Sequence, residues 1–153
     1  MRMVTVRHKP RQKQVYCFSV PSALAPYLGN ANGTRVTCIT RKGIQPGTIV
    51  GDSMEGSEAM RFAKENGAHF PLASITSVRK MLPIDQIRVP GYLLNSRPRA
   101  EKLQQRRAEY ESTGEFSTAI RIDAMSGELL DGYTAYVAAK QMGLNKLHCW
   151  VSM

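Results

Sequence analysis

The first third of the chain contains no acidic residue. None of the twelve Asp and Glu residues falls within residues 1–51, whereas eight of the 21 Lys and Arg residues do, which gives a formal charge of +8 there and +1 over residues 52–153. A solvated surface normally mixes both signs of charge, so a segment of one sign favours a polyanionic partner over a basic surface without one. We therefore predict that this segment contacts nucleic acid.

Long apolar runs are also missing. No stretch approaches the roughly 18 consecutive apolar residues of a membrane span, and the start, MRMVTVRHKPRQKQ, lacks the apolar core of a signal peptide. The sequence thus predicts a cytoplasmic protein with no membrane partner. At 153 residues, with 42% hydrophobic and 22% charged, it is typical of one medium or two small globular domains.

Cysteine and histidine are too few and too dispersed for a metal centre. Cys17, Cys38 and Cys149 are far apart with no C-x-x-C spacing, and the three histidines supply no ligand pattern. We predict no metal site, and interpret the cysteines as buried structural thiols in a reducing compartment.

The first half of the chain is typical of β structure. Alternating and β-branched patterns predict strands at 3–8, 14–20 and 34–43, with a Pro-Gly turn at 46–47 before a further short strand. A helix is predicted at about 57–67. Short strands joined by tight turns indicate a small barrel or sandwich, so residues 1–80 are predicted to form a basic, β-barrel-like unit resembling an SH3-like barrel.

The second half alternates strands and helices. A strand at 73–81 either closes the first unit or opens the second. Residues 81–153 are predicted to form the second domain, and the chain as a whole is predicted to be α+β. The patterns predict strands at 82–89, 119–123, 128–130 and 146–151, and helices at 99–112 and from Tyr133 to Gly143.

Basic side chains interleaved with aromatic ones in the first unit suit phosphate contact combined with base stacking, as in single-strand or RNA binding. Tyr16 and Phe18 share one face of a strand with Val20, which favours the core for both, and leaves Tyr27 as the stacking candidate. The predicted nucleic-acid contacts are Arg7, Lys9, Arg11, Lys13, Tyr27, Arg35, Arg41 and Lys42.

The stretch LLDGYTAYVAAK places an acid and a glycine where a strand meets a helix. The free backbone N–H groups and the dipole of a helix start favour an anion there, and Gly132 permits a positive φ or a close approach to a ligand. Asp131 is either the helix N-cap, which the residues alone favour, or a polar group aimed at a ligand or metal ion.

Residues 82–151 resemble the ParB/sulfiredoxin family, often labelled ParB-like nuclease. LPIDQIRV resembles the opening strand of that family, and SRPRAEKLQQ resembles the segment that precedes its first helix. TGEFSTAIRID and ELLDGYTAYVAAKQMGLNKLHCWV follow in the family's order of glycine, strand, signature turn, helix, Gly-Leu corner and last strand.

The resemblance implies a phosphate-handling pocket at the turn, with Asp131 as catalytic candidate and phosphate contacts from Gly132, Tyr133, Thr134, Arg97 and Arg99. Mg²⁺ or a nucleotide is the cofactor this would use. The family's phosphate-gripping Arg corresponds to Ala135, and the reactive Cys of sulfiredoxins to Tyr133. Sulfiredoxin chemistry is thereby excluded, because a phenol does not replace a thiolate nucleophile.

Three functions compete on these grounds. The first is a nucleic-acid-binding protein with a degenerate ParB-like domain, encoded by a phage or other mobile element, and homodimeric as ParB-like domains often are. The second is a metal-dependent ParB-like nuclease or nucleotide hydrolase using Asp131. The third is an anti-CRISPR-like inhibitor of a host nucleic-acid-guided defence, which binds guide RNA or a host nuclease complex.

Overall fold

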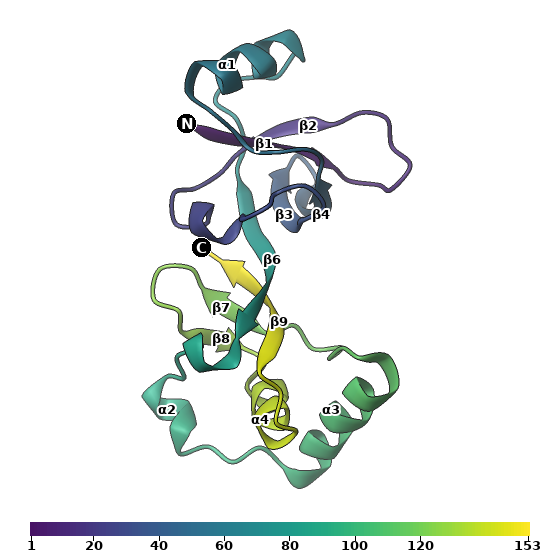
Figure 1. Cartoon of the computed structure of the whole chain (residues 1–153), viewed down its shortest axis with the longest axis vertical. Helices are drawn as coiled ribbons and strands as arrows, with labels where there is room; N and C mark the ends of the chain where they lie inside the picture. The colour runs from purple at the N-terminus through teal and green to yellow at the C-terminus, as the bar shows by residue number, and fades with distance from the viewer. The chain divides into compact units, whose positions relative to one another are not determined.

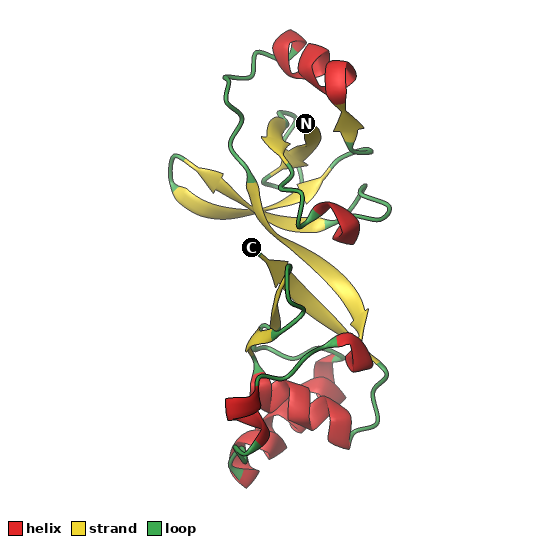
Figure 2. Cartoon of the chain, turned by 90° about the vertical axis from the view of Figure 1, so that its left-hand side faces the viewer, coloured by secondary structure: helices red, strands yellow, loops and turns green.

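The computed structural model describes residues 1–153 and confirms the α+β class. The chain divides into two compact units, Met1–Arg79 with Met153 and Lys80–Ser152. The strands are β1 (Arg2–Arg7), β2 (Tyr16–Ser19), β3 (Arg35–Thr40), β4 (Gly43–Ile49), β5 (Met54–Glu55), β6 (Ile75–Pro83), β7 (Arg121–Asp123), β8 (Leu129–Asp131) and β9 (Lys146–Ser152) (Figure 1). The α-helices are α1 (Gly56–Glu65), α2 (Gly91–Leu94), α3 (Ala100–Thr113) and α4 (Tyr133–Gln141), and the 3-10 helices are η1 (Ala25–Tyr27) and η2 (Ile84–Gln86) (Figure 2).

The first unit is an antiparallel sheet with the strand order β2-β1-β4-β3-β6. The two ends of this order meet, because Ser19 of β2 forms a parallel bridge with Ser74, just before β6, and its amide donates to the carbonyl of Ala73 at 2.8 Å. The short strand β5 pairs with the start of β1. The strands thus form a hydrogen-bonded ring with an inner and an outer face.

Burial follows the alternation of side chains along these strands. Val4, Val6, Val36 and Ile49 are fully or almost fully buried and belong to the inner core. On the outer face α1, which occupies most of the range predicted for a helix, packs its buried Ala59 and Ala63 against Met3, with Phe62 partly buried against the same cluster. The outer face is therefore apolar at the start of β1, where a helix covers it.

The turn between β3 and β4 is not at the Pro46-Gly47 pair, where the sequence predicted it. Both residues lie inside β4, and the chain reverses at Arg41-Lys42 between the paired residues Thr40 and Gly43. A Cβ on Gly47 would lie 2.3 Å from Cγ1 of Val6. Close packing against a neighbouring strand, and not a turn, accounts for this glycine.

In the second unit β7 is antiparallel to β8 and parallel to β9. The helices α3 and α4 contact each other, and Figure 1 draws both below these strands. The apolar core joins the strands, α4 and the segment after β6, and its buried members are Ile84, Ile87, Ile120, Ile122, Leu129, Ala135, Tyr136, Ala139, Leu147 and Cys149.

The predicted strand at 82–89 is wrong over most of its length. Strand β6 ends at Pro83, the 3-10 helix η2 follows, and only an isolated bridge from Arg88 to Glu128 remains extended. Proline has no N–H for a strand ladder, and the three-residue spacing of Ile84 and Ile87 suits a 3-10 turn that buries both. The structure also adds the short helix α2 after Pro90, in a segment predicted to be a loop.

The strand predicted at 73–81 belongs to both units. Strand β6 pairs with β3 through Ile75, Ser77 and Val78, and the division between the units falls after Arg79. The helix predicted at 99–112 is α3, and Gly114 ends it in the left-handed conformation, with φ 78°, as predicted. No helix of the chain is long and apolar enough to cross a membrane.

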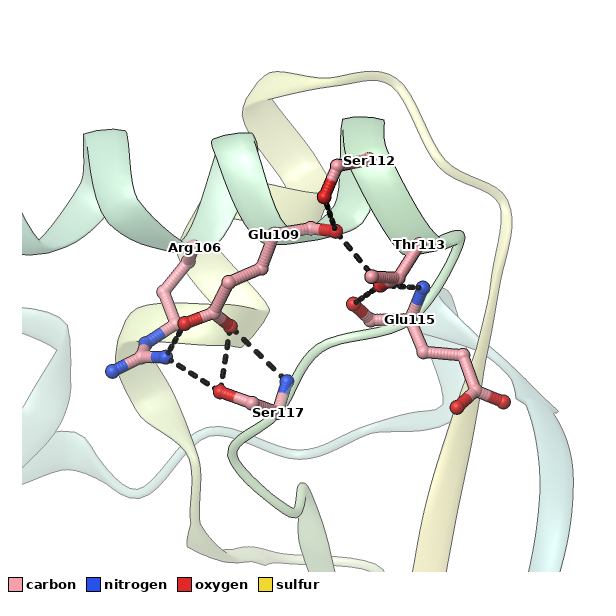
Figure 3. A network of polar contacts seen from close by, with 6 residues as sticks. All are labelled: Arg106, Glu109, Ser112, Thr113, Glu115 and Ser117. Atoms are coloured by element: carbon pink, nitrogen blue, oxygen red, sulfur yellow. Dashed lines mark hydrogen bonds and ion pairs between the residues drawn. The ribbon is translucent and has the colours of Figure 1, made fainter.

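A network of polar contacts holds the end of α3 to the segment after it (Figure 3). Ser117 donates to the Glu109 carboxylate from its hydroxyl at 2.8 Å and from its amide at 3.1 Å. Arg106 forms an ion pair with Glu109 and donates to the Ser117 hydroxyl at 3.1 Å. Because α3 has no fully buried residue, these contacts supplement its limited apolar packing.

Candidate nucleic-acid interface

The outer face of the first unit carries a row of polar side chains across three strands. Arg7 of β1 pairs with Thr48 of β4, and Thr48 pairs on its other side with Arg35 of β3. Directly opposite residues project from the same face of an antiparallel sheet. The pairing therefore places two arginines on either side of a threonine hydroxyl, with Arg35 and Thr48 exposed to solvent.

Arg7 is only partly exposed, and its Nε atom is buried without a hydrogen-bond partner. A guanidinium has five N–H donors and no means of losing its charge in a protein. The Nε–H of Arg7 is thus a buried donor that no acceptor of the chain satisfies.

The remaining cations lie in two segments that connect strands of the first unit. One segment joins β1 to β2 and holds Lys9, Arg11 and Lys13, and the other is the β3–β4 turn with Arg41 and Lys42. The strand register places Arg7 and Arg35 beside the end of β4 that is remote from this turn. We use the name cationic end for seven cations of the first unit, which are Arg7, Lys9, Arg11, Lys13, Arg35, Arg41 and Lys42.

The acidic residues of the first unit lie outside the strands and turns that carry these cations. Glu55 of β5 pairs with the first residue of β1 and forms an ion pair with Arg2. Asp52 follows β4, at the end of that strand where Thr48 pairs with Arg7 and Arg35, and Glu58 and Glu65 lie on α1. The strands β1, β3 and β4 and the two turns that carry the cations contain no acidic residue.

The aromatic prediction needs one correction. Tyr16, predicted to lie in the core, has 38% of its surface exposed, whereas Phe18 is buried as predicted. Tyr27 lies in η1, within the connection from the end of β2 to the start of β3, and its role as a stacking face stays a prediction. Tyr16, the first residue of β2, follows the segment that holds Lys9, Arg11 and Lys13.

The turn at Asp131 and Gly132 has a different character. Gly132, with φ 88°, is the N-cap residue of α4, so the prediction that Asp131 caps the helix is wrong. Asp131 instead ends β8 opposite Arg121 and accepts a hydrogen bond from the Gly132 amide at 2.8 Å. A Cβ on Gly132 would lie 2.8 Å from the carbonyl oxygen of Ala119. Both the glycine and its positive φ are thus explained by packing.

The first turn of α4 is largely enclosed by the core of the second unit. Ala135, at the family's arginine position, has 1% of its surface exposed, and Tyr136 is also buried. Tyr133 is partly buried, and its hydroxyl donates to the carbonyl of Ser96 at 3.3 Å. Since Arg97 follows Ser96 directly, this hydrogen bond brings the start of the 97–99 segment towards the turn. Arg97 and Arg99 are exposed, and Thr134 is partly buried.

No three His, Cys, Asp or Glu side chains are grouped so that they could hold a metal ion. Burial raises the pKa of Cys38 and of Cys149 to about 12, and raises the pKa of the partly buried Cys17 as well. All three cysteines are free and protonated at neutral pH, which makes them poor nucleophiles.

Comparison with known proteins adds no assignment: no family model, curated protein or solved structure matches this chain. Sequence reasoning missed two residues that lie next to cations of the cationic end, Thr48 and His8. Thr48 is identified by strand register alone. The signal for His8 was its position, immediately after a strand and before the segment that holds three cations.

Proposed function

We propose that the protein binds nucleic acid through the cationic end of its first unit. The observation that supports this proposal is that seven cations, two on strands β1 and β3 and five in two turns, lie on segments of the first unit that contain no acidic residue. Seven like charges repel one another, so their gathering is unfavourable for the fold on its own. A polyanion that neutralises them offsets this cost.

The arrangement suits a phosphate backbone better than a small anion. The cations are spread over two strands and two turns, and Lys and Arg in such an array each neutralise one phosphate of an extended chain. Thr48, between Arg7 and Arg35, adds a neutral donor of the kind that commonly contacts phosphate oxygens.

We also propose that the first unit is a small SH3-like barrel and that the second unit is a degenerate member of the ParB/sulfiredoxin family. The hydrogen-bonded ring of strands supports the former. The succession of α3, β7, β8, the Asp131-Gly132 turn, α4 and β9 supports the latter. Binding by the first unit without catalysis by the second is the function that this combination favours.

The test is the salt dependence of binding to a labelled single-stranded oligonucleotide of random sequence. Wild-type affinity is expected to fall steeply between about 50 and 200 mM salt as counterions are released. In the triple variant Lys9→Gln, Arg11→Gln, Lys13→Gln, the slope of log affinity against log salt is expected to shrink by about 2, at about 0.7 per lost phosphate contact.

A triple variant with the same change of charge elsewhere provides the control. Arg61→Gln, Lys64→Gln and Lys102→Gln replace exposed cations of α1 and α3, which carry acidic residues as well. This control is expected to keep a slope close to that of the wild type. Equal losses in the two triple variants would assign binding to net charge alone, and affinity that is independent of salt would refute the proposal.

A further inference from the structure

An aromatic pair stands beside the loop of the cationic end that joins β1 to β2. The rings of His8 and Tyr16 lie 5.5 Å apart between centroids at an interplanar angle of 44°. His8 is the residue that follows β1, and Tyr16 is the first residue of β2. The two rings therefore flank the two ends of the segment that carries Lys9, Arg11 and Lys13.

The His8 ring is held in place by two further contacts. Its edge or face meets the buried ring of Phe18 in a T-shaped arrangement, with centroids 5.8 Å apart and an interplanar angle of 90°. Its Nδ1 lies 2.9 Å from the carbonyl oxygen of Pro46. Because that oxygen only accepts, Nδ1 is the donor in this contact. Tyr16 thus packs against the His8 ring, which is held in place by Phe18 of the core and by the neighbouring strand β4.

The segment between the two rings is ordered as well. The amide of Gln12 donates to the carbonyl of Lys9 at 3.0 Å, and the Gln12 side chain accepts from the amide of His8 at 3.2 Å. These bonds form a closed turn from which Lys9, Arg11 and Lys13 extend into solvent. Exposed cations on an ordered turn next to an exposed ring offer a phosphate contact and a stacking face at the same place.

We infer that Tyr16, supported by His8, is a stacking face for an unpaired nucleobase, and that the cationic end therefore prefers single-stranded DNA or RNA to duplex. This inference rests on the proposed nucleic-acid binding. The bases of a duplex are stacked on one another and do not present a face to a protein side chain, whereas those of a single strand do. Tyr16 is 38% exposed and follows a segment with three cations, so part of its ring is accessible to a base whose phosphate those cations contact.

The experiment compares four probes of equal length, about 12 nucleotides, within the usual site size of such proteins. They are a single-stranded DNA, a single-stranded RNA, a DNA duplex, and a DNA strand whose central nucleotides are abasic. The abasic strand keeps the phosphates and removes the stacking partners. Wild-type protein is expected to bind at least one base-bearing single strand roughly tenfold more tightly than the abasic strand, and the DNA and RNA arms show which sugar it prefers.

Three variants assign the effect to the ring. Tyr16→Leu is expected to lose roughly tenfold in affinity for the preferred single strand, while its affinity for the duplex and the abasic strand changes less than about twofold. Tyr16→Phe keeps the stacking face and is expected to retain the preference, which controls for folding. Tyr92→Leu, a substitution at a tyrosine of α2 that is 76% exposed, is expected to change nothing.

Each result decides between the two proposals. If none of the four probes binds in a salt-dependent way, the proposed function fails and this inference fails with it. If all four probes bind, and Tyr16→Leu lowers the affinity for each of them equally or not at all, the nucleic-acid function stands and the stacking role of Tyr16 is refuted. Loss of the preference in Tyr16→Phe as well would also refute it, because the phenyl ring stacks without the hydroxyl.

Discussion

The two units of this protein use their charged side chains differently. In the second unit several charges are satisfied within the chain: Glu109 by Ser117 and Arg106, Asp123 by Ser126, and Asp131 by the Gly132 amide. At the cationic end of the first unit, the charges extend into solvent with no acidic residue on the same strands and turns. A charge that the fold already uses needs no external partner, whereas a gathered set of like charges does.

The same contrast applies to the two sites expected from the sequence. The Asp131-Gly132 turn keeps the appearance of a phosphate-binding turn, yet each of its unusual residues has a packing reason in the second unit. Most cations of the cationic end are exposed to solvent, and Tyr16 packs on His8 with 38% of its surface exposed. Exposure without an internal partner therefore identifies the candidate interface better than the resemblance of a motif.

The sharpest challenge to this comparison is Ala135→Arg, which restores the family's arginine. Ala135 is 1% exposed, so we expect overpacking and charge burial to lower the free energy of unfolding by about 3 kcal/mol or more. Urea titration followed by the fluorescence of Trp150, the single tryptophan, measures it. Gln141→Arg, at an exposed position of the same helix, is the control and is expected to cost little. A stable Ala135→Arg protein with a gain in nucleotide affinity would instead support the Asp131-Gly132 turn as a phosphate-binding site.

Gly132→Ala tests the packing explanation of the glycine. The new Cβ would lie 2.8 Å from the Ala119 carbonyl oxygen in a left-handed backbone conformation, and we expect a loss of about 3 kcal/mol in the free energy of unfolding. Gly114→Ala has a similar φ with no atom within 4 Å of the new Cβ. We expect that control to lose about 1 kcal/mol. The same urea titration measures both variants. Equal losses of unfolding free energy would contradict the close approach to Ala119 as the reason for a glycine at position 132.

Exposed arginines of the two units provide a matched pair for binding. The double variant Arg35→Gln, Arg41→Gln is expected to lower single-strand affinity about tenfold, or about 1.4 kcal/mol, and to leave thermal stability nearly unchanged. Arg97→Gln with Arg99→Gln removes the same charge from the segment before α3 and is expected to stay within about twofold of wild type. The reverse order of effects, measured by fluorescence anisotropy, would move the interface to the second unit.

The smallest effect concerns the polar network of α3. Hydrogen bonds from Ser117, and then the Arg106 guanidinium, lower the pKa of Glu109. A lowered pKa in the folded state means that the carboxylate contributes stability at neutral pH and loses it as the pH falls below about 4.3, the usual value for glutamate. Glu109→Gln should therefore flatten the acid side of the stability curve. Glu111→Gln on the same helix is expected to leave the curve unchanged, and a flattening of equal size in both variants would contradict a specific role for Glu109.

Local sequence patterns predicted most elements of this fold. The Gly114 helix end, the polar helix α3 and the strand β9 follow from side-chain periodicity and glycine conformation, which act over a few residues. The errors occurred where a neighbouring strand or the core decided the outcome. Pro46 and Gly47 resemble a turn, but the close approach of Val6 to Gly47 places them within β4. After Pro83 the burial of both Ile84 and Ile87 replaced an extended strand with a 3-10 turn.

The sequence by itself determined the charge of the first third of the chain, and with it the kind of partner that we propose. Only the tertiary structure decided which of those cations come together, because strand register joins Arg7 to Arg35 through Thr48 across distant parts of the chain. It also exposed Tyr16, which the sequence had assigned to the core, and enclosed Ala135 in a core. The periodicity of side chains depends on residues that are neighbours in the sequence. Which side chains lie side by side, and which are exposed, depends instead on which strands pair and which faces they cover.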